Sequence, residues 1–149
     1  MTKQELKEEL KKAMLARDTA KTSTLRMVIS ALGYYEINKG GANYEATPED
    51  VEAVIQKEVK QRRDSIEQFK AGGRDDLVAN ETNELEMLSA YLPKQLSEEE
   101  IRKIVTETIS ATGATSLQDM GKIMGALMPK VKGKADGNLV NKIVRETLL

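Results

Sequence analysis

The sequence contains no cysteine, histidine or tryptophan, and its aromatic residues are one phenylalanine and four tyrosines. Without cysteine there is no disulfide framework, thiolate nucleophile or cysteine-bound zinc. Without histidine the chain lacks the commonest metal ligand and general base. No apolar run approaches the ~20 residues that a membrane-spanning helix needs, and the polar, acidic N-terminus is not typical of a signal peptide. We therefore expect a cytoplasmic protein that binds no membrane, metal or cofactor.

Catalytic motifs are also missing. The sequence has no Gly-x4-Gly-Lys-Ser/Thr loop, no dinucleotide-binding glycine fingerprint and no strand pattern that could carry one. The serines and threonines stand mostly where they would cap helices, without a base beside them. The residues by themselves therefore predict a helical binding module and do not predict an enzyme with its own chemistry.

What the chain does contain favours helices. Apolar residues make up 40% of its 149 residues and charged residues 32%, and a core of Leu, Ile, Val, Met and Ala favours packing of helix on helix. The net charge of −1 hides an uneven distribution, because residues 120–149 carry six basic and two acidic side chains. A dedicated nucleic-acid binder is usually more basic overall, so any phosphate contact would be local.

Apolar spacing and capping residues predict seven helices. Four are expected before Pro93, at about residues 3–17, 20–38, 48–71 and 74–91, with the first two forming a hairpin. Pro93 then breaks the pattern. Three more are expected at about residues 98–111, 117–128 and 137–148, with Pro129 ending the second of these. The fold is therefore predicted to be all-α, with an N-terminal domain at residues 1–93 and a C-terminal domain at residues 94–149.

The stretch from Met120 to Asn141 combines small residues with an excess of positive charge. A basic loop leads into the last helix, whose N-terminal amides carry a partial positive charge. Lysines, glycines and a helix N-terminus together predict a phosphate site, although a solvated basic turn remains an alternative. The candidate nucleic-acid-binding residues are Lys122, Lys130, Lys132, Gly133, Lys134, Gly137, Asn138 and Lys142. No catalytic residue is assigned.

Two other features have simpler interpretations. Gly121 and Gly125 lie four residues apart in a predicted helix, where each glycine costs about 1 kcal/mol. We attribute them to close packing of a neighbouring helix, with a ligand contact as the alternative. Lys21 and Arg26 are interpreted as the solvated flank of the second helix, with a functional role as the alternative.

Several motifs resemble the YqeY family of small bacterial proteins. They lie at residues 92–97, 120–137 and 140–145, with further matches at residues 16–18 and 23–27. The family's C-terminal domain is in turn similar to the tail of GatB, a subunit of the amidotransferase that converts mischarged Glu-tRNA(Gln) or Asp-tRNA(Asn) to the amide form. The resemblance implies an N-terminal helical domain of two hairpins followed by a three-helix tail domain that helps to dock tRNA.

Three functions are compatible with the sequence and this resemblance. The first is a non-catalytic module that binds tRNA or assists a tRNA-dependent amidotransferase. The second is a protein-interaction module in translation, with an amidotransferase subunit or another translation protein as its partner. The third is a component of a carbon–nitrogen ligase that uses glutamine as amido donor. The resemblance does not imply catalysis by this chain, because the catalytic parts of the amidotransferase lie outside the shared tail.

Overall fold

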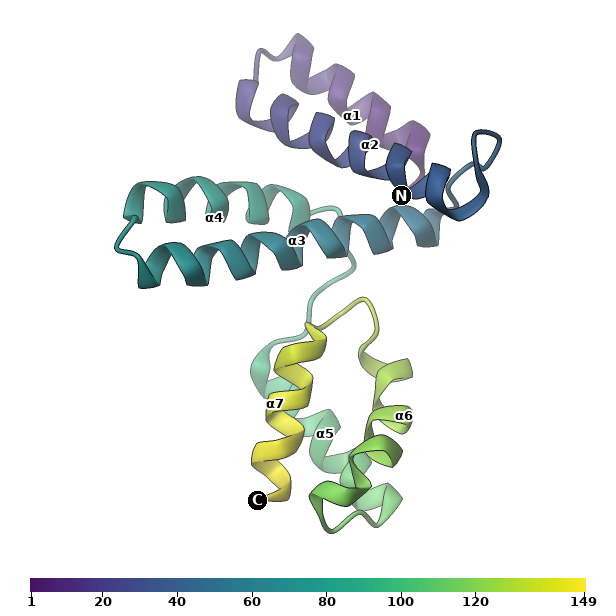
Figure 1. Ribbon diagram of the computed structural model, residues 1–149, viewed down its shortest axis with the longest axis vertical. Helices are drawn as coiled ribbons and strands as arrows, with labels where there is room; N and C mark the ends of the chain where they lie inside the picture. Colours follow the sequence, from purple (N-terminus) through teal and green to yellow (C-terminus); the bar gives the residue numbers. More distant parts are fainter. The chain divides into compact units, whose positions relative to one another are not determined.

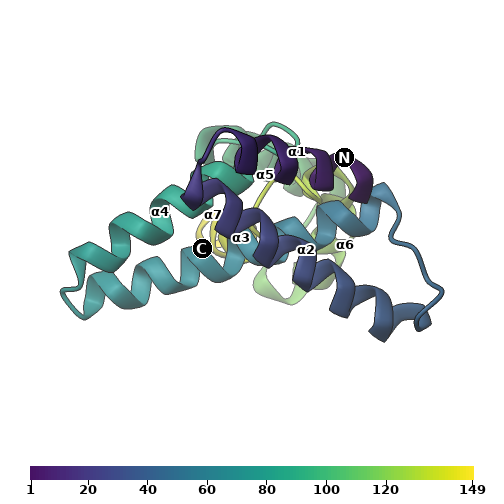
Figure 2. The ribbon, with the colours of Figure 1, turned by 90° about the horizontal axis from the view of Figure 1, so that it is seen from above.

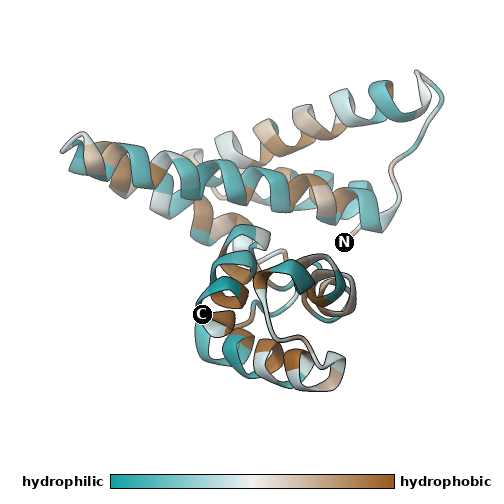
Figure 3. Ribbon diagram, turned by 60° about the horizontal axis from the view of Figure 1, so that its bottom comes forward, coloured by the Kyte–Doolittle hydropathy of each residue, from teal (hydrophilic) through white to brown (hydrophobic).

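The computed structural model describes all residues, 1–149, and contains seven α-helices, one short 3-10 helix and no strands. The prediction of an all-α chain is confirmed. The contacts divide the chain into two compact units, Met1–Leu92 and Pro93–Leu149. The helices carry both hydrophobic and hydrophilic residues (Figure 3), and none combines the length and apolar character needed to cross a membrane.

The first unit is built from four helices (Figure 1), which are α1 (Lys3–Leu15), α2 (Thr19–Gly40), α3 (Pro48–Ala71) and α4 (Asp75–Ser89). α1 packs against α2, α3 packs along α4, and α2 also contacts both α3 and α4. The view in Figure 2 shows the long loop between α2 and α3 at one edge of this unit. The fully buried side chains that join the helices include Leu6, Leu25, Leu32, Ile55 and Leu88.

Capping residues fix where these helices begin, as the sequence predicts. Thr2 and Thr47 each form a capping box, with Glu5 and Asp50 respectively. Such a box satisfies amides that a helix start leaves without a partner. α2 begins after Asp18, whose side chain accepts from the backbone N–H of Lys21.

Arg62 is buried in α3, although its charge interrupts the apolar pattern of that helix. It is 4% exposed. Its Nη1 contacts the Glu58 carboxylate at 2.7 Å, and its Nε donates to Glu84 of α4 at 2.9 Å. A buried charge is tolerated when it is paired and hydrogen-bonded. The acidic residues of α4 are therefore not all solvated, since Glu84 joins the two helices.

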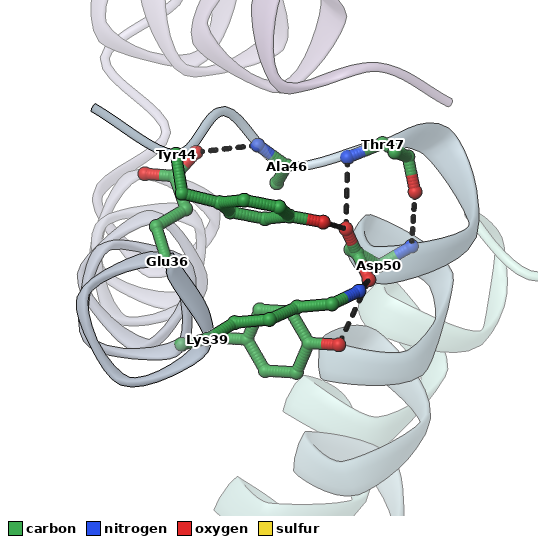
Figure 4. A network of polar contacts seen from close by, with 7 residues as sticks. Glu36, Lys39, Tyr44, Ala46, Thr47 and Asp50 are labelled. Carbon is green, nitrogen blue, oxygen red and sulfur yellow. Dashed lines mark hydrogen bonds and ion pairs between the residues drawn. The ribbon is translucent and has the colours of Figure 1, made fainter. Parts of the chain in front are cut away.

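A polar network holds the loop between α2 and α3 (Figure 4). The carboxylate of Asp50, which is 5% exposed, accepts hydrogen bonds from Lys39, from the Tyr35 hydroxyl at 2.8 Å and from the Tyr44 hydroxyl at 2.6 Å. Asp50 also accepts from the backbone N–H of Thr47 at 3.0 Å. One carboxylate thus fixes a helix start and the loop that leads to it.

The second unit contains α5 (Glu98–Thr112), the 3-10 turn η1 (Leu117–Asp119), α6 (Met120–Val131) and α7 (Gly137–Leu148). α5 contacts both α6 and α7. Its core has Ile101, Val105, Ile123, Leu127 and Ile143 fully buried. Burial of each such side chain contributes about 1.5–3 kcal/mol, so this unit has an apolar core of its own.

The sequence predicted that Pro129 ends α6, and this prediction is wrong, because the helix continues to Val131. Proline removes one N–H from the helix ladder. The carbonyl deprived of its partner is that of Gly125, an exposed residue, so water can hydrate it. Val131 is 1% exposed, and burying its side chain favours one more half-turn of helix. The backbone N–H of Lys132 still donates to the Met128 carbonyl at 2.8 Å.

Candidate nucleic-acid interface

The predicted basic residues lie at both ends of α6, on the loop at residues 132–136 and on the first turns of α7. Lys122 and Lys130 belong to α6, Lys132 and Lys134 to the loop, and Lys142 to α7. All five lysines are exposed. The structure therefore places them within one helix–loop–helix segment of the second unit, which Figure 1 shows at the C-terminal end of the chain.

The backbone of the basic loop is held in place by the segment that precedes α5. The Lys134 carbonyl accepts from the backbone N–H of Leu96 at 2.8 Å, and the Gly133 carbonyl accepts from Nε2 of Gln95 at 3.0 Å. Gly133 adopts φ 79°, a conformation that side chains with a Cβ disfavour. Two carbonyls of the loop are thus bonded within the protein, while its lysine side chains stay exposed.

The five lysines differ in how far they are engaged by other side chains. Lys132 and Lys134 have no hydrogen-bonding or ion-pair partner for their amines. Nζ of Lys130 donates to the Thr108 hydroxyl at 3.1 Å, and Lys142 lies 4.0 Å from the carboxylate of Glu146. The two loop lysines are therefore the cations most available to an external anion.

Lys122 lies near a carboxylate. Backbone N–H groups of Thr115 and then Ser116 hold the pKa of Asp119 below its ordinary value, and the charge of Lys122 lowers it further. Asp119 thus stays ionised beside Lys122, which reduces the positive potential at this end of α6.

The start of α7 is less open to an anion than the sequence suggested. Asp136 is its N-cap, and the Asp136 carboxylate accepts from the backbone N–H of Asn138 at 2.8 Å. One of the amides expected to face a phosphate is therefore already bonded to an acid of the chain. Gly137 occupies the first helical position, and a Cβ added to it would meet no atom within 4 Å. Its small size is not required by its surroundings.

Gly121 and Gly125 of α6 do not pack against a neighbouring helix, so that interpretation is wrong. Both glycines are exposed, and a Cβ on either would meet no atom within 4 Å. Leu117 and Met128 near them are 46% and 37% exposed. The sequence could not show this, because spacing places the two glycines on one side of a helix without saying which side is buried.

The sequence also missed a basic site at the turn between α1 and α2. Lys21 is engaged, since it forms an ion pair with Glu9 at 3.2 Å. Arg17 and Arg26 form no such pair, and both line one surface hollow. The only signal in the sequence was an arginine at the end of a helix, where glycine is the commoner residue.

The helical fold and the exposed lysine loop define an all-α protein with one basic segment and no assembled group of metal-ligating side chains. The family model described as "Yqey-like protein" matches residues 3–148. The chain belongs to the YqeY family, as its motifs indicated.

Curated relatives share the name "Altered inheritance of mitochondria protein 41, mitochondrial". The protein of Eremothecium gossypii is 35% identical over 127 residues, which is 85% of this chain and 65% of the relative. That of Saccharomyces cerevisiae (strain YJM789) is 30% identical over 150 residues, or 95% and 80%. That of Clavispora lusitaniae is 34% identical over 128 residues, or 85% and 71%. The chain thus spans slightly less than two thirds of the Eremothecium protein.

These names correct one expectation. A cytoplasmic location was expected from the sequence, whereas the relatives are named as mitochondrial proteins. The expectation was wrong because the lack of a long apolar segment bears on membrane insertion and not on which compartment holds a helical protein. The relatives' names also do not support the description of the family as bacterial.

Proposed function

We propose that this protein is a helical module that binds tRNA through the basic loop of its second unit, and that it binds without catalysing a reaction by itself. The observation that carries the proposal is the state of Lys132 and Lys134. Both are exposed and unpaired, on a loop in which two carbonyls accept hydrogen bonds from Gln95 and Leu96. A prepositioned pair of cations suits contacts to phosphates, which position an RNA without reading its sequence.

The choice of tRNA rests on the family resemblance. In this proposal the three helices of the second unit are a tail domain like that of GatB, and the four helices of the first unit form an accessory domain. The protein would then assist a tRNA-dependent amidotransferase, whose catalytic parts lie on other chains. The alternative is that this chain contributes to carbon–nitrogen ligase activity. An amide-forming reaction that stops when this protein is left out would support that alternative.

The test is a titration of fluorescently labelled bulk tRNA at two salt concentrations. With few phosphate contacts we expect a dissociation constant of ~1 μM or weaker that rises steeply with salt. Lys132→Gln combined with Lys134→Gln should weaken binding and lower the slope of log K against log salt by about one for each lysine. Absence of binding at low salt contradicts the proposal.

A matched control variant separates the effect of the loop lysines on binding from the effect of the protein's net charge. Lys7→Gln combined with Lys11→Gln removes the same charge from exposed positions of α1. This pair should leave tRNA binding almost unchanged. An equal loss in both double variants would mean that the loop is not the site. Incubation of the protein with mischarged tRNA, ATP and glutamine should give no amide product unless amidotransferase subunits are added.

A second candidate is a protein-interaction module, and the exposed face of α6 favours it. Gly121 and Gly125 leave the helix backbone open, with Leu117 and Met128 exposed beside it. A helix of an amidotransferase subunit could approach such a face closely. Co-purification that survives nuclease treatment and is lost in Gly125→Leu supports this function, whereas RNA-dependent co-purification supports the first.

A further inference from the structure

A hollow of about 640 Å³ lies at the turn that joins α1 to α2 in the first unit, whereas the lysine loop belongs to the second unit. Its size falls within the roughly 300–1,000 Å³ of small-molecule sites. Both arginines of this turn, Arg17 and Arg26, line it, together with the hydroxyl-bearing Thr19, Thr22 and Ser23. The turn is visible in Figure 1 where the two purple helices meet.

The charge of this hollow is not neutralised from within the protein. The guanidinium groups of Arg17 and Arg26 have no hydrogen-bonding or ion-pair partner. The nearby acids are engaged elsewhere, since Glu9 pairs with Lys12 at 2.9 Å and with Lys21 at 3.2 Å. The Asp18 side chain accepts from a backbone N–H as the cap of α2. Two unpaired guanidiniums therefore share one concave surface with three hydroxyls that also lack a side-chain hydrogen bond.

Arg17 stands at a position where glycine is the easiest residue to accommodate. Its φ is 56°, and it is the only residue other than glycine with a positive φ. The backbone N–H of Arg17 donates to the Met14 carbonyl at 3.1 Å, and that of Asp18 donates to the Ala13 carbonyl at 3.0 Å. These two bonds form the helix-ending motif in which a left-handed residue, usually glycine, closes the helix.

The end of α3 provides a direct comparison within the same chain. Its closing bonds run from Gly73 to Lys70 and from Arg74 to Phe69, in the same pattern, and the left-handed residue there is Gly73 with φ 69°. A left-handed conformation costs a residue with a Cβ roughly 1–2 kcal/mol. The α1 end thus holds an arginine in a strained conformation where the α3 end uses glycine. Such strain is typical of functional sites, so we expect the arginine side chain to have a role beyond closing the helix.

Apolar surface flanks the charged groups. Met14 and Met27 also line the hollow, and their side chains are 49% and 45% exposed. Thioethers make favourable contacts with aromatic rings, whereas guanidinium groups suit phosphate oxygens because they donate in a planar fork. Hydroxyls donate to phosphate as well. A ligand that matches all three kinds of group carries both a phosphate and a flat ring.

We propose that this hollow binds a phosphorylated nucleoside, with its phosphate held by Arg17 and Arg26 and its base against Met14 and Met27. The nucleoside comes either from a free nucleotide or from a nucleotide within an RNA strand. The site lies in the first unit and does not depend on tRNA binding by the lysine loop. Loss of Lys132 and Lys134 therefore leaves nucleotide binding at Arg17 and Arg26 intact.

The test is a series of ¹H–¹⁵N NMR titrations of the full chain with adenosine monophosphate, adenosine and inorganic phosphate. Adenosine monophosphate should shift amide signals at residues 14–27 and bind more tightly than adenosine or phosphate alone. A hexaadenylate without terminal phosphates forms a further arm. Tighter binding of the hexaadenylate indicates an RNA strand as the source, and tighter binding of the monophosphate indicates a free nucleotide; both support the site.

The variants separate binding from folding. Arg26→Gln should weaken binding of the monophosphate about tenfold, because a hydrogen bond to a charged group is lost, whereas Lys11→Gln, outside the hollow, should not. Arg17→Gly should weaken binding equally while raising the melting temperature, because glycine removes the strain. The proposal is overturned if no signals at residues 14–27 shift, if adenosine or phosphate binds as tightly as the monophosphate, or if Arg17→Gly and Arg26→Gln bind like the wild type.

Discussion

The carboxylate of Asp136 accepts a hydrogen bond from the backbone N–H of Asn138 over 2.8 Å at the start of α7. This bond caps the helix. The same carboxylate carries a negative charge that lies close to Lys132 and Lys134 in the sequence. The cap stabilises the fold and opposes the binding of an anion at the same helix end. Stability and binding should therefore respond in different ways when Asp136 is replaced.

Asp136→Ser should strengthen tRNA binding while keeping the helix cap. Serine and aspartate are comparable N-caps, whereas removing one partly exposed negative charge should raise affinity by up to about fivefold. The measurement is a tRNA titration at low salt combined with a thermal melt. Glu107→Gln, which removes an exposed charge from α5, is the control. An equal gain in Glu107→Gln would show that only net charge matters.

The stability of the first unit should fall in acid through Asp50. The hydrogen bonds from Lys39 and Tyr44 are the main causes that hold the pKa of Asp50 well below its ordinary value of 3.8. The native state therefore prefers the carboxylate. Its contribution is fully present above the unfolded pKa of about 3.9, and it is lost as pH falls below that value towards the lower native pKa.

Urea unfolding between about pH 7 and pH 2 measures this effect. Asp50→Asn should lower stability at neutral pH and flatten its decline in acid, because the variant has no carboxylate to protonate. The stability of Tyr44→Phe at neutral pH should lie between those of the wild type and Asp50→Asn, since this variant removes one hydrogen-bond donor to Asp50. Glu49→Gln, at an exposed neighbouring position, should behave like the wild type. A decline as steep in Asp50→Asn as in the wild type would assign the effect to other carboxylates.

Gly133 and Gly137 should respond in opposite ways to alanine. Gly133 has φ 79° and lies in the loop that Gln95 contacts, so Gly133→Ala should destabilise the second unit by roughly 1–2 kcal/mol. Gly137 is helical and its Cβ position is open, so Gly137→Ala should stabilise it by about 0.5–1 kcal/mol. Chemical denaturation of both variants measures the difference. Equal effects would mean that φ does not distinguish the two sites.

Gly121 and Gly125 should also tolerate alanine. Since a Cβ on either glycine meets no atom within 4 Å, each substitution should stabilise α6 by about 1 kcal/mol through helix propensity alone. Destabilisation in a denaturant titration would instead indicate a contact at this face. The double variant Gly121→Ala, Gly125→Ala should be more stable than the wild type. If it nevertheless binds a protein partner more weakly, the two glycines belong to a docking surface.

Local rules predicted most of the secondary structure. Thr2, Thr47 and Ser97 begin their helices as capping residues, and Gly113 ends α5 in a left-handed conformation. These features depend on a few neighbouring residues, which is why spacing reveals them. Pro129 is the exception, because burial of Val131 in the core favours continuation of the helix beyond the proline.

The candidate site was predictable only as a set of residue types. The sequence indicated Lys132 and Lys134, but it could not tell that they are unpaired while Lys130 contacts Thr108. Pairing depends on which helices meet, and Lys130 and Thr108 lie 22 residues apart on two different helices. The Arg17 and Arg26 hollow was missed for the same reason, since two residues nine positions apart share a surface only once the hairpin forms.

The sequence by itself determined that the chain is all-α, where most helices begin, and that it belongs to the YqeY family. Caps, periodicity and motifs depend on residues close together in the sequence, so they can be recognised without knowing the fold. Tertiary structure decided which charges are available. It buried Arg62 between two glutamates and left Arg17, Arg26, Lys132 and Lys134 without partners. Availability for binding depends on which groups the packed helices bring together, and no single segment contains that information.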